Sequence, residues 1–351
     1  MTPHRRSAQR RARPRRVAAL ALAGVLVAAA CGGGGGSGDQ RARSSAGLRR
    51  LTVALDWTPN TNHSGVYLAK ARGWYRDAGL DVKIVSPGDA GSLQLLGTGK
   101  ADVAFTTQEE IIPARAEGVP VVAISSVIQH NTSSLVALRR SGITRPRDLE
   151  GKTYGGYGGQ LEKALVRTLV SCDGGDPSKV RFTEVGNVDY RVGMQRGDYD
   201  FVWIFDAWDG IRYTQIDKLP VTTIPFIRYT RCIPDWYTPM LATSEKALTK
   251  DRSALRAFMA ATVRGYQAAI ADPGAAAGAL LKAVPELDPR LVQASARYLA
   301  PRYADDPGRW GRQDAAVWRR MAAFLRTSGL LRRDIDVSRA FTNDLLPASG
   351  R

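Results

Sequence analysis

Short apolar runs alternate with helical patterns through most of this 351-residue chain, and this alternation constrains its fold more than any other feature. An apolar segment at 51–57 is followed by a helical segment at 62–79, a second apolar segment at 81–87 and similar pairs up to residue 128. Buried strands that alternate with helices of about 10–15 residues are typical of βαβ units on a parallel sheet. The sequence therefore predicts an α/β protein.

The same pattern starts again after residue 150, and the chain becomes helical after residue 244. Two successive α/β patterns with a helical C-terminal segment indicate two Rossmann-like lobes. The predicted parts are lobe I at 48–138 plus 239–351 and lobe II at 139–238. Extended segments at 133–143 and 235–244 would cross between the lobes as a two-strand hinge, with a ligand bound in the cleft between them.

The first 47 residues have the composition of an export leader and a tether. Seven arginines and no acidic residue precede the apolar run 17–30, which is too short to span a bilayer. A basic region, a short apolar run and small residues at the cleavage site indicate a signal peptide at 1–30. Ala-Ala-Ala-Cys resembles a bacterial lipobox, so Cys31 is the expected lipidation site. The Gly/Ser-rich residues 31–47 would then tether the folded part to the extracytoplasmic face of the membrane.

Charge and cysteine content argue against several classes of protein. Basic residues outnumber acidic ones by 50 to 33, yet no basic run is interleaved with aromatics, so no nucleic-acid partner is predicted. Three histidines without a Cys/His cluster argue against a metal site, and no motif predicts a cofactor. Cys172 and Cys232 could pair in an exported protein, but their spacing does not decide between a disulfide and two thiols.

The run LDWTPNTNHSGVYLAKARGWYRDAGLDVKIV at 55–85 is similar to the signature of the thiamine-pyrimidine-precursor family. That family contains aminopyrimidine-binding proteins of ABC importers and the related fungal pyrimidine synthases. Further matches follow in the expected order at 97–105, 118–138, 148–159, 200–210 and 234–239. The resemblance implies a type II periplasmic-binding-protein fold and a small planar aminopyrimidine ligand that is passed to an ABC permease.

Three other functions fit parts of the same pattern. Similar receptors bind other aromatic heterocycles such as riboflavin, receptors for alkanesulfonates or nitrate share the fold, and an exported pyrimidine-processing enzyme is the third alternative. By the resemblance, the fungal synthases consume an internal histidine and use a cysteine-rich segment with iron, whereas Cys232 stands alone in this chain. We therefore expect a binding protein rather than an enzyme.

The end of the first predicted strand holds the first candidate ligand contacts. Asp56 and Trp57 lie there, where open α/β sheets place their ligands. Trp57 can stack on a flat ring, and Asn60 or His63 can form hydrogen bonds with the edge of that ring. The alternative is that Trp57 belongs to the core and that Asn60 is a turn or cap residue. Thr107 follows a later predicted strand and is a further candidate.

A glycine-rich tract and an aromatic strand supply the remaining candidates. Glycines between a strand and a helix would let a ligand approach the backbone and the helix N-terminus, or would form a tight turn. These glycines are Gly155, Gly156, Gly158 and Gly159. The segment 200–210 offers the rings of Trp203, Phe205 and Trp208, and the carboxylate of Asp206 can pair with a protonated ring. The family usually has an aromatic residue in place of Asp206.

Overall fold

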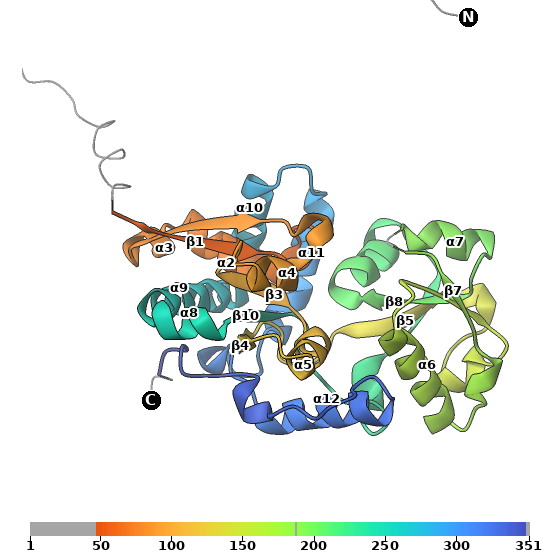
Figure 1. Ribbon diagram of the computed structural model, residues 1–351. Helices are drawn as coiled ribbons and strands as arrows, with labels where there is room; N and C mark the ends of the chain where they lie inside the picture. Colours follow the sequence, from red (N-terminus) through yellow and green to blue (C-terminus); the bar gives the residue numbers. More distant parts are fainter. Residues whose placement is uncertain (1–46, 187, 349–351) are drawn as a thin grey trace, which may run out of the picture. The chain divides into compact units, whose positions relative to one another are not determined.

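The computed structural model describes residues 47–186 and 188–348 (Figure 1). The predicted signal peptide, the lipidation site at Cys31 and nearly all of the tether lie outside the described residues. Within them, the expected α/β arrangement is present as two five-stranded sheets with helices packed against them. None of the described helices is long and apolar enough to cross a membrane.

The first sheet is built from β1 (Arg49–Ala54), β2 (Leu80–Val85), β3 (Val103–Thr106), β4 (Val121–Ser126) and β10 (Met240–Ser244). Their order across the sheet is β2-β1-β3-β10-β4. β1 is parallel to β2 and β3, whereas β10 is antiparallel to β3 and β4. β3 and β4 are buried along their whole length, which agrees with their continuous apolar sequences.

The second sheet is built from β5 (Ser133–Leu138), β6 (Thr153–Gly156), β7 (Arg181–Glu184), β8 (Phe201–Phe205) and β9 (Val221–Pro225). Their order is β7-β6-β8-β5-β9. β6 is parallel to β7 and β8, whereas β5 is antiparallel to β8 and β9. Both sheets therefore have the same topology, with three parallel strands followed by an antiparallel strand that reaches the sheet from the other lobe.

Strand β5 corrects one predicted lobe boundary. The range 48–138 was expected in lobe I, but residues 133–138 pair with β8 and β9 in the second sheet. The chain thus crosses between the lobes before β5, and it returns between β9 and β10. The apolar sequence of β5 looks the same in either sheet, so its composition alone did not reveal which lobe it joins.

The predicted helix over 62–79 is divided into α2 (Ser64–Ala71) and α3 (Trp74–Asp77). Gly73 separates them with φ of 78°, a conformation that favours glycine. The helix expected over 159–171 is α6 (Gln160–Cys172). The other α-helices of the described residues are α4 (Ser92–Gly97), α5 (Gln108–Ala116), α7 (Tyr190–Arg196), α8 (Glu245–Lys250), α9 (Arg252–Ala271), α10 (Pro273–Ala283), α11 (Pro289–Leu299) and α12 (Ala315–Thr327).

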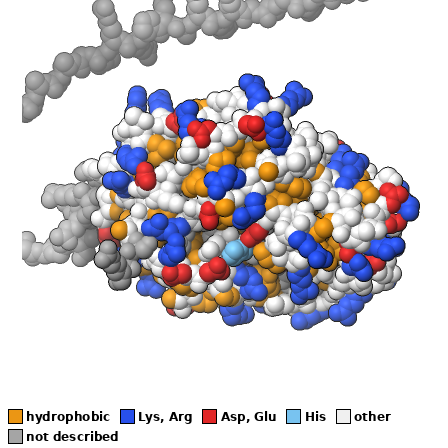
Figure 2. All heavy atoms as spheres, turned by 90° about the horizontal axis from the view of Figure 1, so that it is seen from below, with side chains coloured by type: hydrophobic (Ala, Val, Ile, Leu, Met, Phe, Trp, Pro, Cys, Tyr) orange, Lys and Arg blue, Asp and Glu red, His pale blue; other side chains and the backbone are white. Residues whose placement is uncertain are grey.

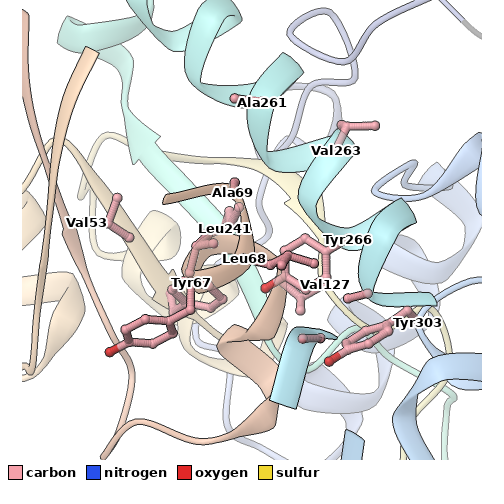
Figure 3. Packing of buried hydrophobic residues seen from close by; sticks show 14 of the residues in the cluster. Val53, Tyr67, Leu68, Ala69, Val127, Leu241, Ala261, Val263, Tyr266 and Tyr303 are labelled. Atoms are coloured by element: carbon pink, nitrogen blue, oxygen red, sulfur yellow. The ribbon is translucent and has the colours of Figure 1, made fainter. Parts of the chain in front are cut away.

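Helices α2 and α9 pack closely beside the first sheet (Figure 3). Their contact depends on Gly65, because a Cβ atom there would meet the Tyr266 ring at 2.3 Å. The Tyr266 hydroxyl donates to the backbone oxygen of Asn62 over 2.7 Å, and the Tyr303 hydroxyl donates to that of Thr61 over 2.6 Å. Residues of the C-terminal part therefore hold in place the segment that follows the first strand.

Cys172 and Cys232 form a disulfide bond within lobe II, which resolves the alternative that their sequence spacing left open. It ties the end of α6 to the segment that leads back to the first lobe. The charged surface is mixed: Figure 2 shows Lys and Arg side chains scattered over one face, with acidic and hydrophobic side chains between them. This distribution is that of a solvated surface rather than of a continuous basic groove.

Candidate ligand-binding site

The candidate site lies where parallel strands of both sheets end. Asp56 and Trp57 follow β1, Thr107 follows β3, and Asp206 follows β8. Parallel strands end at the same edge of their sheet, which is where α/β proteins bind ligands. We refer to the residues that directly follow β1, β3, β6 and β8, together with the last residue of β8, as the strand-end site.

All three exposed aromatic side chains of the described residues belong to this site. Trp57 follows β1 and is 38% exposed, Tyr157 follows β6 and is 65% exposed, and Phe205 ends β8 and is 36% exposed. Trp57 is thus not a core residue. The sequence offered the ring of Phe205, whereas Tyr157 was missed, although its position after a predicted strand was a usable signal. Exposed aromatic faces at one sheet edge are suited to stacking on a flat ligand.

Asp56 and His63 form a hydrogen-bonded pair beside Trp57. The Nε2 atom of His63 lies 2.8 Å from Oδ1 of Asp56. His63 is fully buried, whereas the side chain of Asp56 is 21% exposed. Asn60 is also buried and caps the short helical turn Thr61–His63 through its side chain, as the alternative interpretation proposed. Among these predicted contacts, Asp56 and Trp57 are accessible, and Asn60 and His63 are not.

The start of α5 adds acidic groups to the strand-end site. Burial raises the pKa of Glu109 to about 8, although the indole Nε1 of Trp236 donates to its carboxylate over 2.8 Å. The side chain of Glu110 is exposed, but the surrounding protein displaces enough water from its carboxylate to raise its pKa, and Asp56 adds to the shift. Thr107 is half-buried at the N-cap of α5, and its side chain does not cap the helix.

Two carboxylates follow β8. Burial raises the pKa of Asp206 to about 6, and burial has the same effect on Asp209. Trp203 packs against Phe226 and Trp236, with ring centroids 5.2 and 6.1 Å away, and its Nε1 is buried without a hydrogen-bond partner among the described residues. A buried donor without a partner is uncommon in proteins.

The glycine-rich tract does not provide the open helix N-terminus that the sequence predicts. The backbone N–H groups of residues 157, 158 and 159 donate to the carboxylate of Glu162 over 3.1, 3.0 and 2.8 Å. Cβ atoms at Gly155 and Gly156 would meet the rings of Tyr199 and Tyr154 at 2.5 and 2.2 Å. Packing and a tight turn, with φ of 96° at Gly158, thus explain these glycines.

Trp208 lies in the contact between the lobes rather than with the exposed aromatics. It is half-buried and packs on the cluster formed by Ile211 with Leu291 and Ala294 of α11. Two cavities, of about 400 Å³ between α6 and α12 and about 550 Å³ beside α9, contain none of the predicted contacts. No group of His, Cys, Asp and Glu in the described part of the chain could hold a metal ion.

The crossovers between the lobes contain a histidine that sequence reasoning missed. His130 lies between β4 and β5, with Nδ1 2.5 Å from Asp235 and Nε2 3.1 Å from Asp305. Hydrogen bonding to Asp235 and Asp305 raises the pKa of His130 to about 9 despite partial burial. Asp235 precedes β10 on the second crossover, so the pair joins the two crossovers. The position of His130 beside a predicted crossover was the available sequence signal.

Comparison with a solved structure identifies the fold. The aliphatic sulphonate-binding protein SsuA from Escherichia coli aligns with a TM-score of 0.65 at 16% identity, over 83% of this chain and 91% of that one. The fold is thus the two-lobe α/β fold of periplasmic binding proteins. The family profile described as "NMT1/THI5 like" matches residues 60–276, and the chain belongs to this family.

Two curated relatives match nearly the whole chain. A formylaminopyrimidine-binding protein of Halalkalibacterium halodurans is 26% identical over 86% of this chain and 92% of the relative. A 4-amino-5-hydroxymethyl-2-methylpyrimidine phosphate synthase of Legionella pneumophila is 24% identical over 85% of this chain and 92% of the relative. The family resemblance seen in the sequence is confirmed, and the relatives include both a named binding protein and a named synthase.

Proposed function

We propose that this protein is an extracytoplasmic solute-binding lipoprotein of an ABC importer that captures an aminopyrimidine precursor of thiamin between its lobes. The observation that carries the proposal is the accessible pair of Asp56 and Trp57 at the end of β1. Lipidation at Cys31 would keep the protein at the membrane, and closure of the lobes over the ligand would create the form that the permease recognises.

The chemistry of an aminopyrimidine suits the strand-end site. Its flat ring can stack on Trp57, and Phe205 or Tyr157 offers a second aromatic face. Its ring nitrogen and adjacent amine can form a two-point, charge-assisted contact with the carboxylate of Asp206. Its amine can also donate to the oxygen of Asp56 that His63 leaves free.

An anionic ligand such as a sulfonate or nitrate is less compatible with this site. The N-terminus of α6 is already occupied by the Glu162 carboxylate. None of the carboxylates of Glu109, Glu110 and Asp206 is within 4 Å of a Lys or Arg nitrogen among the described residues. The pKa of Asp206 is about 6, so its carboxylate is mostly ionised at pH 7, and its repulsion would weaken the binding of an anion.

Two observations favour binding over synthesis. His63 is fully buried and uses both ring nitrogens in hydrogen bonds, so it is not presented to a substrate. Cys232 is bonded to Cys172 and does not offer a free thiolate. We therefore infer reversible capture of the ligand without chemical change.

Mass spectrometry of small molecules released from the purified protein tests this proposal. We expect a pyrimidine carrying an amine, at close to one molecule per protein, and no such molecule from the Trp57→Ala variant. Val192→Ala, which alters an exposed side chain on α7, is the matched control and should retain the ligand. Release of a flavin or a sulfonate would overturn the ligand assignment, and conversion of an added pyrimidine would overturn the binding role.

A further inference from the structure

We propose that His63 is a positioning residue: it holds one oxygen of the Asp56 carboxylate so that the other accepts a hydrogen bond from an amine of the ligand. This inference rests on the proposed function, and it adds a defined tautomer and a division of roles between the two residues. His63 does not touch the ligand in this arrangement; it acts through Asp56.

The hydrogen bonds of His63 specify where its proton lies. The backbone N–H of Asn60 donates to Nδ1 of His63 over 3.1 Å, so Nδ1 must be unprotonated. The remaining ring proton is therefore on Nε2, which lies 2.8 Å from Oδ1 of Asp56 and donates to it. A second proton on Nδ1 would face the Asn60 N–H and remove that hydrogen bond.

The surroundings of His63 fix the ring in this orientation. The side chain is fully buried, and its ring lies edge-on to Phe105 with centroids 4.7 Å apart and an interplanar angle of 84°. The residues before it are held by hydrogen bonds from Tyr303 to Thr61 and from Tyr266 to Asn62. His63 thus presents a donor to Asp56 from a rigid position.

The second carboxylate oxygen of Asp56 is available to a ligand. In the described part of the chain, Oδ2 of Asp56 has no hydrogen-bond partner, and His63 is the residue that the carboxylate contacts. Because the donor is a neutral imidazole, it orients the carboxylate without cancelling its negative charge. A carboxylate in this state favours a ligand that brings an amine N–H or a positive charge.

Nuclear magnetic resonance of the full chain labelled with ¹⁵N-histidine tests the tautomer directly. With three histidines in the chain, assignment needs only the His4→Gln and His130→Gln variants. At pH 7 we expect His63 as a neutral ring with the proton on Nε2, and His130 as an imidazolium that serves as the internal reference. A proton on Nδ1 of His63, or a doubly protonated His63, would overturn the proposal.

Calorimetric titration with two matched pyrimidines tests the role in binding. The probes are 4-amino-5-hydroxymethyl-2-methylpyrimidine and the same molecule without its 4-amino group. The His63→Leu variant loses the charge-assisted hydrogen bond from His63 to Asp56. We expect the ratio of its affinities for the amino and the deamino pyrimidine to be roughly tenfold lower than that of the wild type. His63→Gln keeps an amide donor and should recover part of it.

A double-mutant cycle separates positioning from a purely structural effect. If His63 acts through Asp56, the His63→Leu and Asp56→Asn changes should reduce the amine preference less than additively when combined. Additive losses, or an unchanged preference in a folded His63→Leu variant, would overturn the proposal. If the wild type binds neither pyrimidine, the proposed function is wrong, and so is the role of Asp56 in contacting the ligand. The tautomer measured by nuclear magnetic resonance still decides whether His63 holds Asp56.

Discussion

Ser295 on α11 donates a hydrogen bond from its hydroxyl to the backbone oxygen of Ala207, directly after β8. The same hydroxyl lies 2.5 Å from Oγ1 of Thr61, in the segment that carries Asp56 and His63. One buried serine therefore joins the residues that follow β1 in the first sheet to those that follow β8 in the second. The two halves of the strand-end site are connected through the protein as well as through any ligand.

Ser295→Ala should destabilise the protein by leaving two buried polar groups without a partner. We expect the free energy of unfolding to fall by about 1–3 kcal/mol. Urea unfolding measures the change. Thr327→Ala, which removes an exposed hydroxyl bonded within its own helix, is the control and should change stability by less than about 0.5 kcal/mol. Equal stabilities of wild type and Ser295→Ala would show that the contact contributes nothing.

Trp57→Ala should weaken ligand binding without altering stability. Loss of a stacking face costs about 1–3 kcal/mol of binding free energy by analogy with aromatic stacking on bases. Calorimetric titration measures the affinity, and urea unfolding checks that the exposed side chain leaves the free energy of unfolding unchanged. An unaltered affinity would remove Trp57 from the site.

Glu162→Ala should open an anion site at the N-terminus of α6. The variant leaves the N–H groups of residues 157–159 without their acceptor, so the free energy of unfolding should fall by about 1–3 kcal/mol. Added methanesulfonate should raise the melting temperature of the variant and not that of the wild type. Stabilisation of the wild type by methanesulfonate would instead favour an anion receptor.

His130 should make stability depend on pH at the crossovers. Its pKa is raised to about 9 in the folded protein by Asp235 and Asp305, above the unperturbed histidine value of about 6.5. The stabilisation is therefore complete below pH of about 6.5 and is lost as the pH rises through about 9. Urea unfolding between pH 6 and 10 should show that the free energy of unfolding of the wild type exceeds that of His130→Gln at low pH and that this difference shrinks as the pH rises. A constant difference across this range would contradict the raised pKa.

Removing the disulfide should destabilise lobe II. The bond joins residues separated by 60 positions, and closing a loop of that length in the unfolded chain is worth about 4 kcal/mol in the chain-entropy description. In urea unfolding, the free energy of unfolding of the Cys172→Ser/Cys232→Ser double variant should be lower than that of the wild type by about this amount. Reduction of the wild type should produce the same loss, whereas equal stability of oxidised and reduced protein would contradict it.

Periodicity in the sequence was enough to predict the α/β class, and the run at 55–85 was enough to indicate the family. The sheet in which β5 pairs was not predictable from the sequence, because an apolar strand pairs equally well in either sheet. Only the tertiary fold determines which sheet it joins. The accessible pair of Asp56 and Trp57 lies at the end of the predicted strand, whereas burial of Asn60 and His63 depends on tyrosines more than 200 residues away. Glu162 could fill the helix N-terminus because it stands three residues after Gly159 in a capping position.

Calorimetric titration of the purified protein with formylaminopyrimidine and with 4-amino-5-hydroxymethyl-2-methylpyrimidine tests the central claim most directly. The proposed function predicts reversible binding of one molecule per protein, with the pyrimidine recovered unchanged and with riboflavin and methanesulfonate producing no comparable heat. Tighter binding of riboflavin or methanesulfonate, or recovery of a converted product, would contradict it.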